Sequence, residues 1–212
     1  MRKGFYPDLS NEDYNADPAL RASTLNRFAT SPDGSDIPRQ SLAMMFGQIF
    51  HHLALTPKLP LPVAITEASI TMVSEAQEMA HVFRESAEGK ELLGSAFCES
   101  SLFWTQDGID AKARPDILAQ GYMADLKTTR DLSRFEADAL GYGYHRQAAW
   151  YLDGVGSVMS HRPASVLLVA MEKTAPYRLE LFKISKTQLE AARQQNAVHL
   201  ELYKRSLKDK AK

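Results

Sequence analysis

The sequence is poor in cysteine, because Cys98 is the only one among its 212 residues. A single thiol cannot form an intrachain disulfide, and it cannot supply a four-cysteine zinc site or iron–sulfur cluster. The fold must therefore be stabilised by an apolar core, and a hydrophobic content of 44% is sufficient for one. A chain of this kind is typical of the cytoplasm.

Long apolar runs are also missing. No stretch approaches the roughly 18 to 20 uninterrupted apolar residues that span a bilayer, and the first eight residues lack the apolar region of a secretory signal. We therefore expect a soluble protein with no membrane partner. We expect one domain over residues 1–212, with a helical N-terminal part to about residue 56 and the chemistry in a core from about 57 to 212.

An excess of charge of either sign is absent as well. The 25 lysines and arginines and the 26 aspartates and glutamates give a net charge of −1. The overall charge neither indicates nor excludes a nucleic-acid partner, so any field that attracts phosphate must be local. Residues 186–212 hold seven basic and three acidic side chains. This segment is typical of a solvated helix end, with a phosphate-attracting tail as the alternative.

The spacing of apolar residues predicts several helices. Apolar side chains recur at helical spacing from Leu42 to Leu53, and residues 73–87 have the pattern of a mostly polar helix. A helix over residues 143–152 is expected to end at Gly154. Two segments have the spacing of helix capping boxes, Ser133 to Glu136 and Ser185 to Gln188.

Alternating segments predict strands between these helices. They are a short strand after Pro62 and strands at 96–105, 109–118, 122–128, 164–171 and 177–184. Turns at 106–108 and 119–121 would join three of them into an antiparallel meander. The order of elements predicts an α/β fold in which a central mixed β-sheet is flanked by helices.

Two acidic residues and a lysine are expected to meet on this sheet. Asp125 and Lys127 are two residues apart on a strand, so both project to one face while Leu126 points into the opposite layer. The turn at 119–121 can bring Asp116 across from Asp125 or diagonal to it. Two neighbouring carboxylates repel each other in water, and a shared Mg²⁺ converts that repulsion into coordination.

A bound Mg²⁺ would polarise a phosphate and lower the pKa of a water molecule, while Lys127 orients that water or stabilises charge in the transition state. Taken alone, an Asp-x-Lys segment after Pro-Asp is also common in solvated hairpins. Other residues are needed to decide between these readings.

A resemblance to a known superfamily supplies them. Arg114-Pro115-Asp116, eight further residues and then Asp125-Leu126-Lys127 resemble the signature of the PD-(D/E)xK nucleases. Downstream, Gln147 and Tyr151 resemble the Gln-x-x-x-Tyr helix motif of the exonuclease branch of that superfamily. The two lie one helical turn apart and face the same way, so both can reach DNA or the active centre. Tyr151 taken alone is typical of a core residue.

Upstream segments extend the resemblance to the exonuclease VIII (RecE-type) family. Gly47-Gln-Ile-Phe-His51 resembles a helix motif of that family, and Ser10 to Tyr14 with Ser23-Thr-Leu25 resembles its N-terminal stretch. The resemblance runs from about residue 9 to residue 155. It implies that His51 is a metal ligand, although a lone helical histidine is usually structural or solvated. His52 lies about 100° further around the helix and should point elsewhere.

The resemblance also implies a site and a cofactor. Its ligands to Mg²⁺, with Mn²⁺ as a substitute, would be His51, Asp116, Asp125 and the backbone carbonyl of Leu126. Glu99 occupies a position where the family often has an acidic or polar strand residue near the site, and an exposed strand glutamate is the alternative. In catalysis Glu99 would join Asp116, Asp125 and Lys127, while Gln147 and Tyr151 position the substrate.

The implied activity is a Mg²⁺-dependent 5′-to-3′ exonuclease on double-stranded DNA ends. It would leave 3′ overhangs for a single-strand annealing recombinase in phage-type recombination, within the cytoplasm of a bacterial host of a phage or prophage. The resemblance to lambda-type exonucleases implies a homo-oligomeric ring, a trimer or tetramer. The single cysteine separates this chain from relatives that carry a four-cysteine cluster.

Arg21 and Ser23 are candidates for binding a terminal 5′ phosphate, because a guanidinium fork and a hydroxyl suit that group. A helix start with a solvated arginine is the alternative. Two further functions stay open: a structure-specific or restriction-like endonuclease, and a non-catalytic DNA-binding or assembly protein with the same fold.

Overall fold

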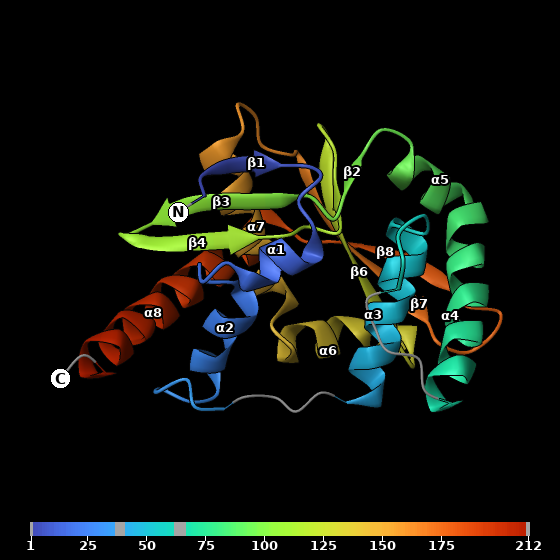
Figure 1. The fold of residues 1–212 in the computed structure, drawn as a ribbon, viewed down its shortest axis with the longest axis horizontal. Coiled ribbons are helices and arrows are strands. Elements are labelled where there is room, and N and C mark those ends of the chain that lie inside the picture. The colour runs from blue at the N-terminus through green and yellow to red at the C-terminus, as the bar shows by residue number, and fades with distance from the viewer. Residues whose placement is uncertain (1, 37–40, 62–66, 211–212) are drawn as a thin grey trace.

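The computed structural model describes residues 2–36, 41–61 and 67–210, which form two β-sheets with helices on both sides (Figure 1). The strands are β1 (Gly4–Tyr6), β2 (Phe97–Cys98), β3 (Ser101–Gln106), β4 (Ile109–Ala113), β5 (Ile117–Leu118), β6 (Tyr122–Thr129), β7 (Ser165–Glu172) and β8 (Leu179–Lys183). The helices are α1 (Asn11–Ala16), α2 (Ala22–Asn26), η1 (Arg27–Ala29), α3 (Leu42–Leu55), α4 (Glu67–Glu85), α5 (Ala87–Leu93), η2 (Leu132–Arg134), α6 (Phe135–Gly141), α7 (Tyr144–Val158) and α8 (Lys186–Lys210). This content confirms the predicted α/β class.

The larger sheet is mixed and has five strands in the order β2-β5-β6-β7-β8. β6 and β7 run parallel from the Tyr122–Ser165 pair to the Thr129–Glu172 pair, and the other neighbours are antiparallel. A parallel pair needs a long crossover, which here contains α6 and α7. The smaller sheet is antiparallel, in the order β1-β3-β4.

The predicted three-stranded antiparallel meander is confirmed in its pairing, but its first two strands are each interrupted and divide between the two sheets. Glu99 interrupts the first strand with a φ of 52°, a left-handed conformation that residues other than glycine rarely adopt. Pro115 interrupts the second, since proline cannot donate a ladder hydrogen bond. The two breaks lie side by side, and the Glu99 N–H donates to the Asp116 carbonyl over 3.0 Å.

Strand β6 alternates between two apolar clusters. Met123 lies in the cluster that includes the ring of Trp150 on α7, whereas Leu126 lies in the cluster that includes Phe50 on α3 and Phe83 on α4. Because side chains of a strand alternate faces, Asp125 shares the α7 side with Met123. This confirms the predicted face of the Asp-x-Lys pair.

Helix α7 continues to Val158, so the predicted end at Gly154 is wrong. A Cβ atom at Gly154 would lie 2.6 Å from the Trp104 ring of β3. The glycine is therefore required by close packing of helix on sheet and does not end the helix. Among the described residues, none of the helices combines the length and apolar character needed to cross a bilayer.

The other helix boundaries follow local hydrogen bonds. Ser185 and Gln188 form the predicted capping box, with reciprocal bonds of 3.2 and 2.8 Å. Asp131 caps the Leu132–Arg134 turn in place of Ser133, because its side chain accepts from the Ser133 N–H. The predicted helix over 73–87 is divided by Ser86, whose side chain caps α5. The short strand expected after Pro62 falls on residues 62–66, outside the described residues.

Candidate metal and catalytic site

Three potential metal ligands lie together where the chain passes between the two sheets. His51 of α3, Glu99 and Asp116 each offer one ligand atom, and these atoms all lie within 4.8 Å of one another. His51 Nδ1 is 3.4 Å from Asp116 Oδ2. Carboxylate oxygens suit hard cations such as Mg²⁺ and Mn²⁺, and imidazole adds a ligand that transition metals accept. The donor set therefore fits a divalent cation.

The charges of this group favour a cation as well. Burial raises the pKa of Glu99 and the nearby Asp116 carboxylate raises it further, against the opposing effect of Arg114. Burial alone would raise the pKa of Asp116, but His51 and Lys127 outweigh it and the pKa is lowered. The lowered pKa of Asp116 favours its ionised form, whereas the raised pKa of Glu99 opposes ionisation. A bound cation would favour the ionised form of both carboxyl groups.

Asp116 is fixed by the strand next to it. The β5–β6 pairing reaches Ile117 and Ala124, and beyond it the Leu126 N–H donates to Asp116 Oδ2 over 2.6 Å. The carboxylate thus takes the place of a missing ladder partner, because Pro115 interrupts the strand. The predicted proximity of Asp116 to β6 is confirmed.

Asp125 and Lys127 form an ion pair beside this group, and both side chains are almost fully shielded from solvent. Burial raises the pKa of Asp125 to about 6, with Lys127 opposing this shift and Asp116 adding to it. Asp125 lies outside the group of three ligand atoms described above. Its assignment as a metal ligand, and that of the Leu126 carbonyl, stay predictions.

Helix α7 presents polar side chains to Lys127. The Lys127 ammonium donates to Gln147 Oε1 over 3.1 Å, and the Gln147 amide donates to the Tyr151 hydroxyl over 2.8 Å. The predicted orientation of Gln147 and Tyr151 to the same side of the helix is confirmed. Their roles toward substrate stay predictions.

Two residues of the site were not predicted. Arg114 Nε donates to Glu99 Oε2 over 2.7 Å, and its Nη1 donates to Ser101 Oγ and the Leu9 carbonyl. Arg114 therefore holds Glu99 in place. Its position next to Pro115-Asp116 in the sequence motif could have identified it as a residue of the site.

The second is Tyr144, whose ring centre lies 4.5 Å from Lys127 Nζ. Its spacing from Gln147 and Tyr151 places all three on one helix face, and that spacing could have identified it.

Other predicted residues lie outside this cluster. Arg21 precedes α2 and donates to Asn15 Oδ1 over 3.0 Å, and Ser23 is exposed. Their role at a 5′ phosphate stays a prediction. His52 Nε2 lies 2.8 Å from the Leu59 carbonyl, which confirms that this histidine points away from His51's partners.

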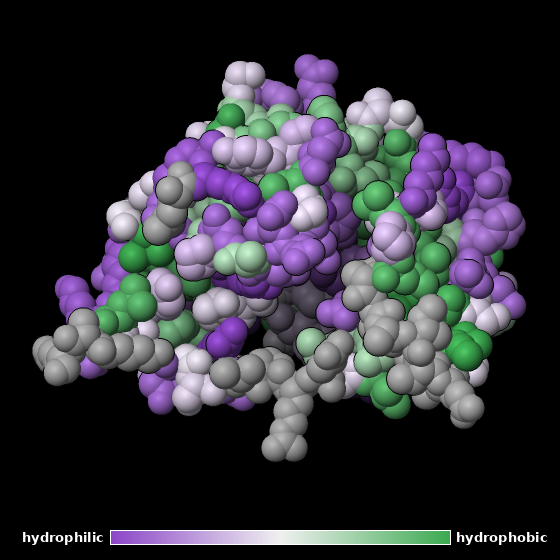
Figure 2. Space-filling model, viewed as in Figure 1, coloured by the Kyte–Doolittle hydropathy of each residue, from purple (hydrophilic) through white to green (hydrophobic). Residues whose placement is uncertain are grey.

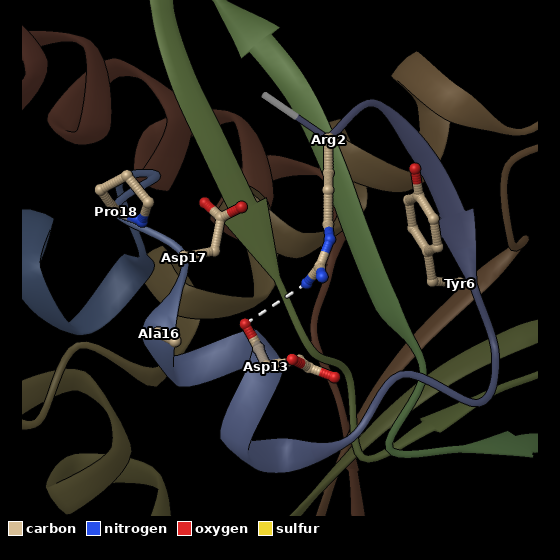
Figure 3. A pocket seen from close by; sticks show the side chains of 6 residues that line it. All are labelled: Arg2, Tyr6, Asp13, Ala16, Asp17 and Pro18. Atoms are coloured by element: carbon tan, nitrogen blue, oxygen red, sulfur yellow. Dashed lines mark hydrogen bonds between the residues drawn. The ribbon is translucent and has the colours of Figure 1, made fainter.

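The surface is hollowed near the centre of the face in Figure 2. A separate open pocket of about 660 Å³, shown in Figure 3, lies against α1 and the N-terminal segment. Its lining residues are Arg2, Tyr6, Asp13, Ala16, Asp17 and Pro18. Because none of them belongs to the cluster around Asp116, this pocket is not the site of the predicted chemistry.

Comparisons with known proteins agree with the fold. The family described as a PDDEXK-like domain of unknown function (DUF3799) matches residues 27–212. The structure of a candidate exonuclease from Eubacterium rectale is similar with a TM-score of 0.71 and 14% identity, covering 94% of this chain and 85% of that chain. At this identity the similarity shows a shared fold. A comparison with curated proteins finds no match.

Two further structures show weaker similarity. An alkaline exonuclease from Laribacter hongkongensis has a TM-score of 0.43 and 14% identity over 91% of this chain and 93% of that chain. A phage related exonuclease from Haemophilus somnus 129PT has a TM-score of 0.44 and 8% identity over 94% and 99% of the respective chains.

Proposed function

The chain belongs to the DUF3799 family of PDDEXK-like domains, and from this premise we propose that it is a divalent-metal-dependent deoxyribonuclease that degrades linear duplex DNA from its ends. Family membership and the mixed α/β fold confirm the predicted PD-(D/E)xK core. The closer relationship to exonuclease VIII stays a prediction.

One observation carries the proposal. The ligand atoms of His51, Glu99 and Asp116 lie within 4.8 Å of one another, beside the ion pair of Asp125 with Lys127. A metal-binding group next to a buried lysine combines a place for a cation with a fixed positive charge for a phosphate. In a solvated hairpin these charged side chains would be exposed to water, because burying a charge costs free energy.

In this proposal His51, Glu99 and Asp116 hold Mg²⁺ or Mn²⁺, with Asp125 and the Leu126 carbonyl as further ligands. When bound, the cation lowers the pKa of water and withdraws charge from the scissile phosphate.

The chain's own groups fix the geometry around the phosphate. The Lys127 ammonium stabilises the negative charge that develops on the phosphate oxygens as water adds to phosphorus and the P–O ester bond breaks. Gln147 holds that ammonium through its carbonyl oxygen, and Tyr151 holds the Gln147 amide. Arg114 keeps Glu99 turned toward the site.

The finer features of the proposal rest on the resemblance. They are 5′-to-3′ polarity, 3′ overhangs for a single-strand annealing recombinase, and service in phage-type recombination within a bacterial cytoplasm. A closed ring of three or four subunits would help a chain of net charge −1 retain a polyanion, because it gathers local positive surface around the duplex. Arg21 and Ser23 remain the proposed contacts to the 5′ phosphate.

Linear and covalently closed forms of one plasmid separate an exonuclease from its endonuclease rival. With Mg²⁺ or Mn²⁺, we expect the linear form to lose one strand from each end as nucleotides and the closed circle to stay intact, because the closed form offers no end. The Lys127→Ala variant, purified in the same way, serves as the control for contaminating endonuclease. Cleavage of both forms at similar rates would contradict the exonuclease assignment, and binding without any cleavage would support the non-catalytic alternative.

A further inference from the structure

Two neighbouring tyrosines, one half-buried against Lys127 and one exposed, have no role in the mechanism above. We call Tyr142 and Tyr144, at the junction of α6 and α7, the aromatic ledge. Tyr142 is 67% exposed, which is unusual for a large aromatic side chain, and its neighbour Leu140 is 57% exposed. A group of exposed apolar side chains next to a catalytic residue indicates a binding surface.

The ledge leads from the catalytic lysine to the surface. The Tyr144 ring centre is 4.5 Å from Lys127 Nζ and 6.4 Å from the buried ring of Phe135. The Tyr142 ring centre is 5.6 Å from that of Tyr144, with an interplanar angle of 34°. Core packing therefore fixes the inner ring, and the outer ring lies no more than about 10 Å from the lysine ammonium.

The backbone holds the outer tyrosine although its side chain is exposed. The Tyr142 N–H donates to the Asp138 carbonyl over 2.8 Å, and the Gly143 N–H donates to the Leu140 carbonyl over 3.1 Å. Gly143 has a φ of +74°, which favours glycine and allows the chain to turn from α6 into α7. The backbone of the ledge is thus fixed before binding, which limits the entropy lost on binding.

This arrangement suits a nucleobase. Successive bases of a stacked strand are about 3.4 Å apart, so a ring within about 10 Å of the catalytic ammonium is within reach of the nucleotides that flank the scissile phosphate. An aromatic ring can stack only on a base whose face is uncovered, whereas both faces are covered inside a duplex. We propose that Tyr142, supported by Tyr144, stacks on an unpaired base of the DNA strand whose phosphodiester bond is cleaved beside Lys127.

The inference rests on the proposed function and narrows its substrate. It requires a strand with at least one unpaired nucleotide at the site, either a single strand or a duplex end that has opened. It also gives a physical reason for the preference for ends, because an intact closed duplex offers no uncovered base.

Single-stranded DNA labelled with 2-aminopurine tests the stacking. The wild-type protein is added to the labelled strand in the presence of Ca²⁺, whose looser coordination should support binding with little cleavage. The 2-aminopurine fluorescence should then fall, because stacking on an aromatic ring quenches it. Tyr142→Ala should weaken binding roughly tenfold and abolish the quenching, given the usual contribution of a base–aromatic stack. Tyr142→Phe should behave as the wild type, and the control Val198→Ala, which removes an exposed apolar side chain on α8, should change binding less than twofold.

The outcomes separate the two proposals. If the wild-type chain cleaves DNA while Tyr142→Ala binds and quenches as the wild type does, the stacking is wrong and the nuclease assignment stands. If Tyr142→Phe is as weak as Tyr142→Ala, a hydroxyl contact replaces stacking and the inference is overturned. If the wild-type chain neither binds nor cleaves DNA, the proposed function itself fails.

Discussion

Replacing Lys127 by alanine is expected to lower kcat on linear duplex DNA by about a hundred- to a thousandfold, the usual cost of removing one group that stabilises transition-state charge. The reason is local, because the Lys127 ammonium is buried between Asp125, Gln147 and the Tyr144 ring. No solvent molecule can reproduce a positive charge fixed in that position. The affinity for duplex DNA should change much less than kcat, since the remaining phosphate contacts are intact.

The variant must be shown to fold, because it leaves the buried Asp125 carboxylate without its ion-pair partner. Circular dichroism and the thermal midpoint, measured with the metal present, provide that check. Lys183→Ala, which removes an exposed lysine on β8, is the matched control and should keep the wild-type kcat. A Lys127→Ala variant with a kcat within threefold of the wild type would show that the lysine has no role in the chemistry.

Asp116→Asn should weaken metal binding and also lower the stability of the metal-free fold. The amide oxygen can still accept the Leu126 N–H, but the negative charge beside Glu99 is lost. Affinity for Mn²⁺ should therefore fall by at least about a hundredfold, beyond the usual loss for a residue that only supports a ligand, and cleavage should become undetectable. The metal-free thermal midpoint should fall, because the attraction of His51 and Lys127 that lowers the pKa of Asp116 is lost, and relief of the repulsion from Glu99 offsets only part of that loss.

Calorimetric titration with Mn²⁺ measures the first effect, and thermal unfolding in chelator measures the second. Asp107→Asn, at the exposed turn between β3 and β4, is the control and should leave both quantities unchanged. Wild-type Mn²⁺ affinity in Asp116→Asn would remove Asp116 from the metal site.

The strand part of the site could be predicted because it depends on short-range geometry. Alternation along β6 placed Asp125 and Lys127 on one face, and one helical turn placed Gln147 and Tyr151 together. The contact between Gln147 and Lys127 joins a strand to the helix that covers it. A motif could suggest that contact, but only packing shows it.

The position of Glu99 could not be read from the same pattern. Its segment alternates like one continuous strand, whereas the structure breaks the strand at Glu99 with a left-handed residue. The break moves the chain from one sheet to the other and brings Glu99 to His51 and Asp116. A non-glycine residue in this conformation is costly, and such residues occur where the surrounding structure over-determines them, often at functional sites.

The extent of α7 shows the same limit for helices. Glycine after a helical pattern usually ends the helix, yet Gly154 lies within α7 because the Trp104 ring of β3 occupies the space of a side chain. That contact joins residues fifty positions apart, and local rules carry no information about it. Helix spacing places Tyr144 on the face of Gln147 and Tyr151, but only packing shows that its ring lies over Lys127.

The most direct test of metal-dependent exonuclease activity follows the two ends of one strand of a linear duplex, labelled separately at the 5′ and the 3′ terminus. With Mg²⁺ or Mn²⁺, a 5′-to-3′ exonuclease should release the 5′ label early as small products and the 3′ label late, with no release of either in chelator. Release in chelator, or loss of neither label with the cation present, would contradict a metal-dependent exonuclease.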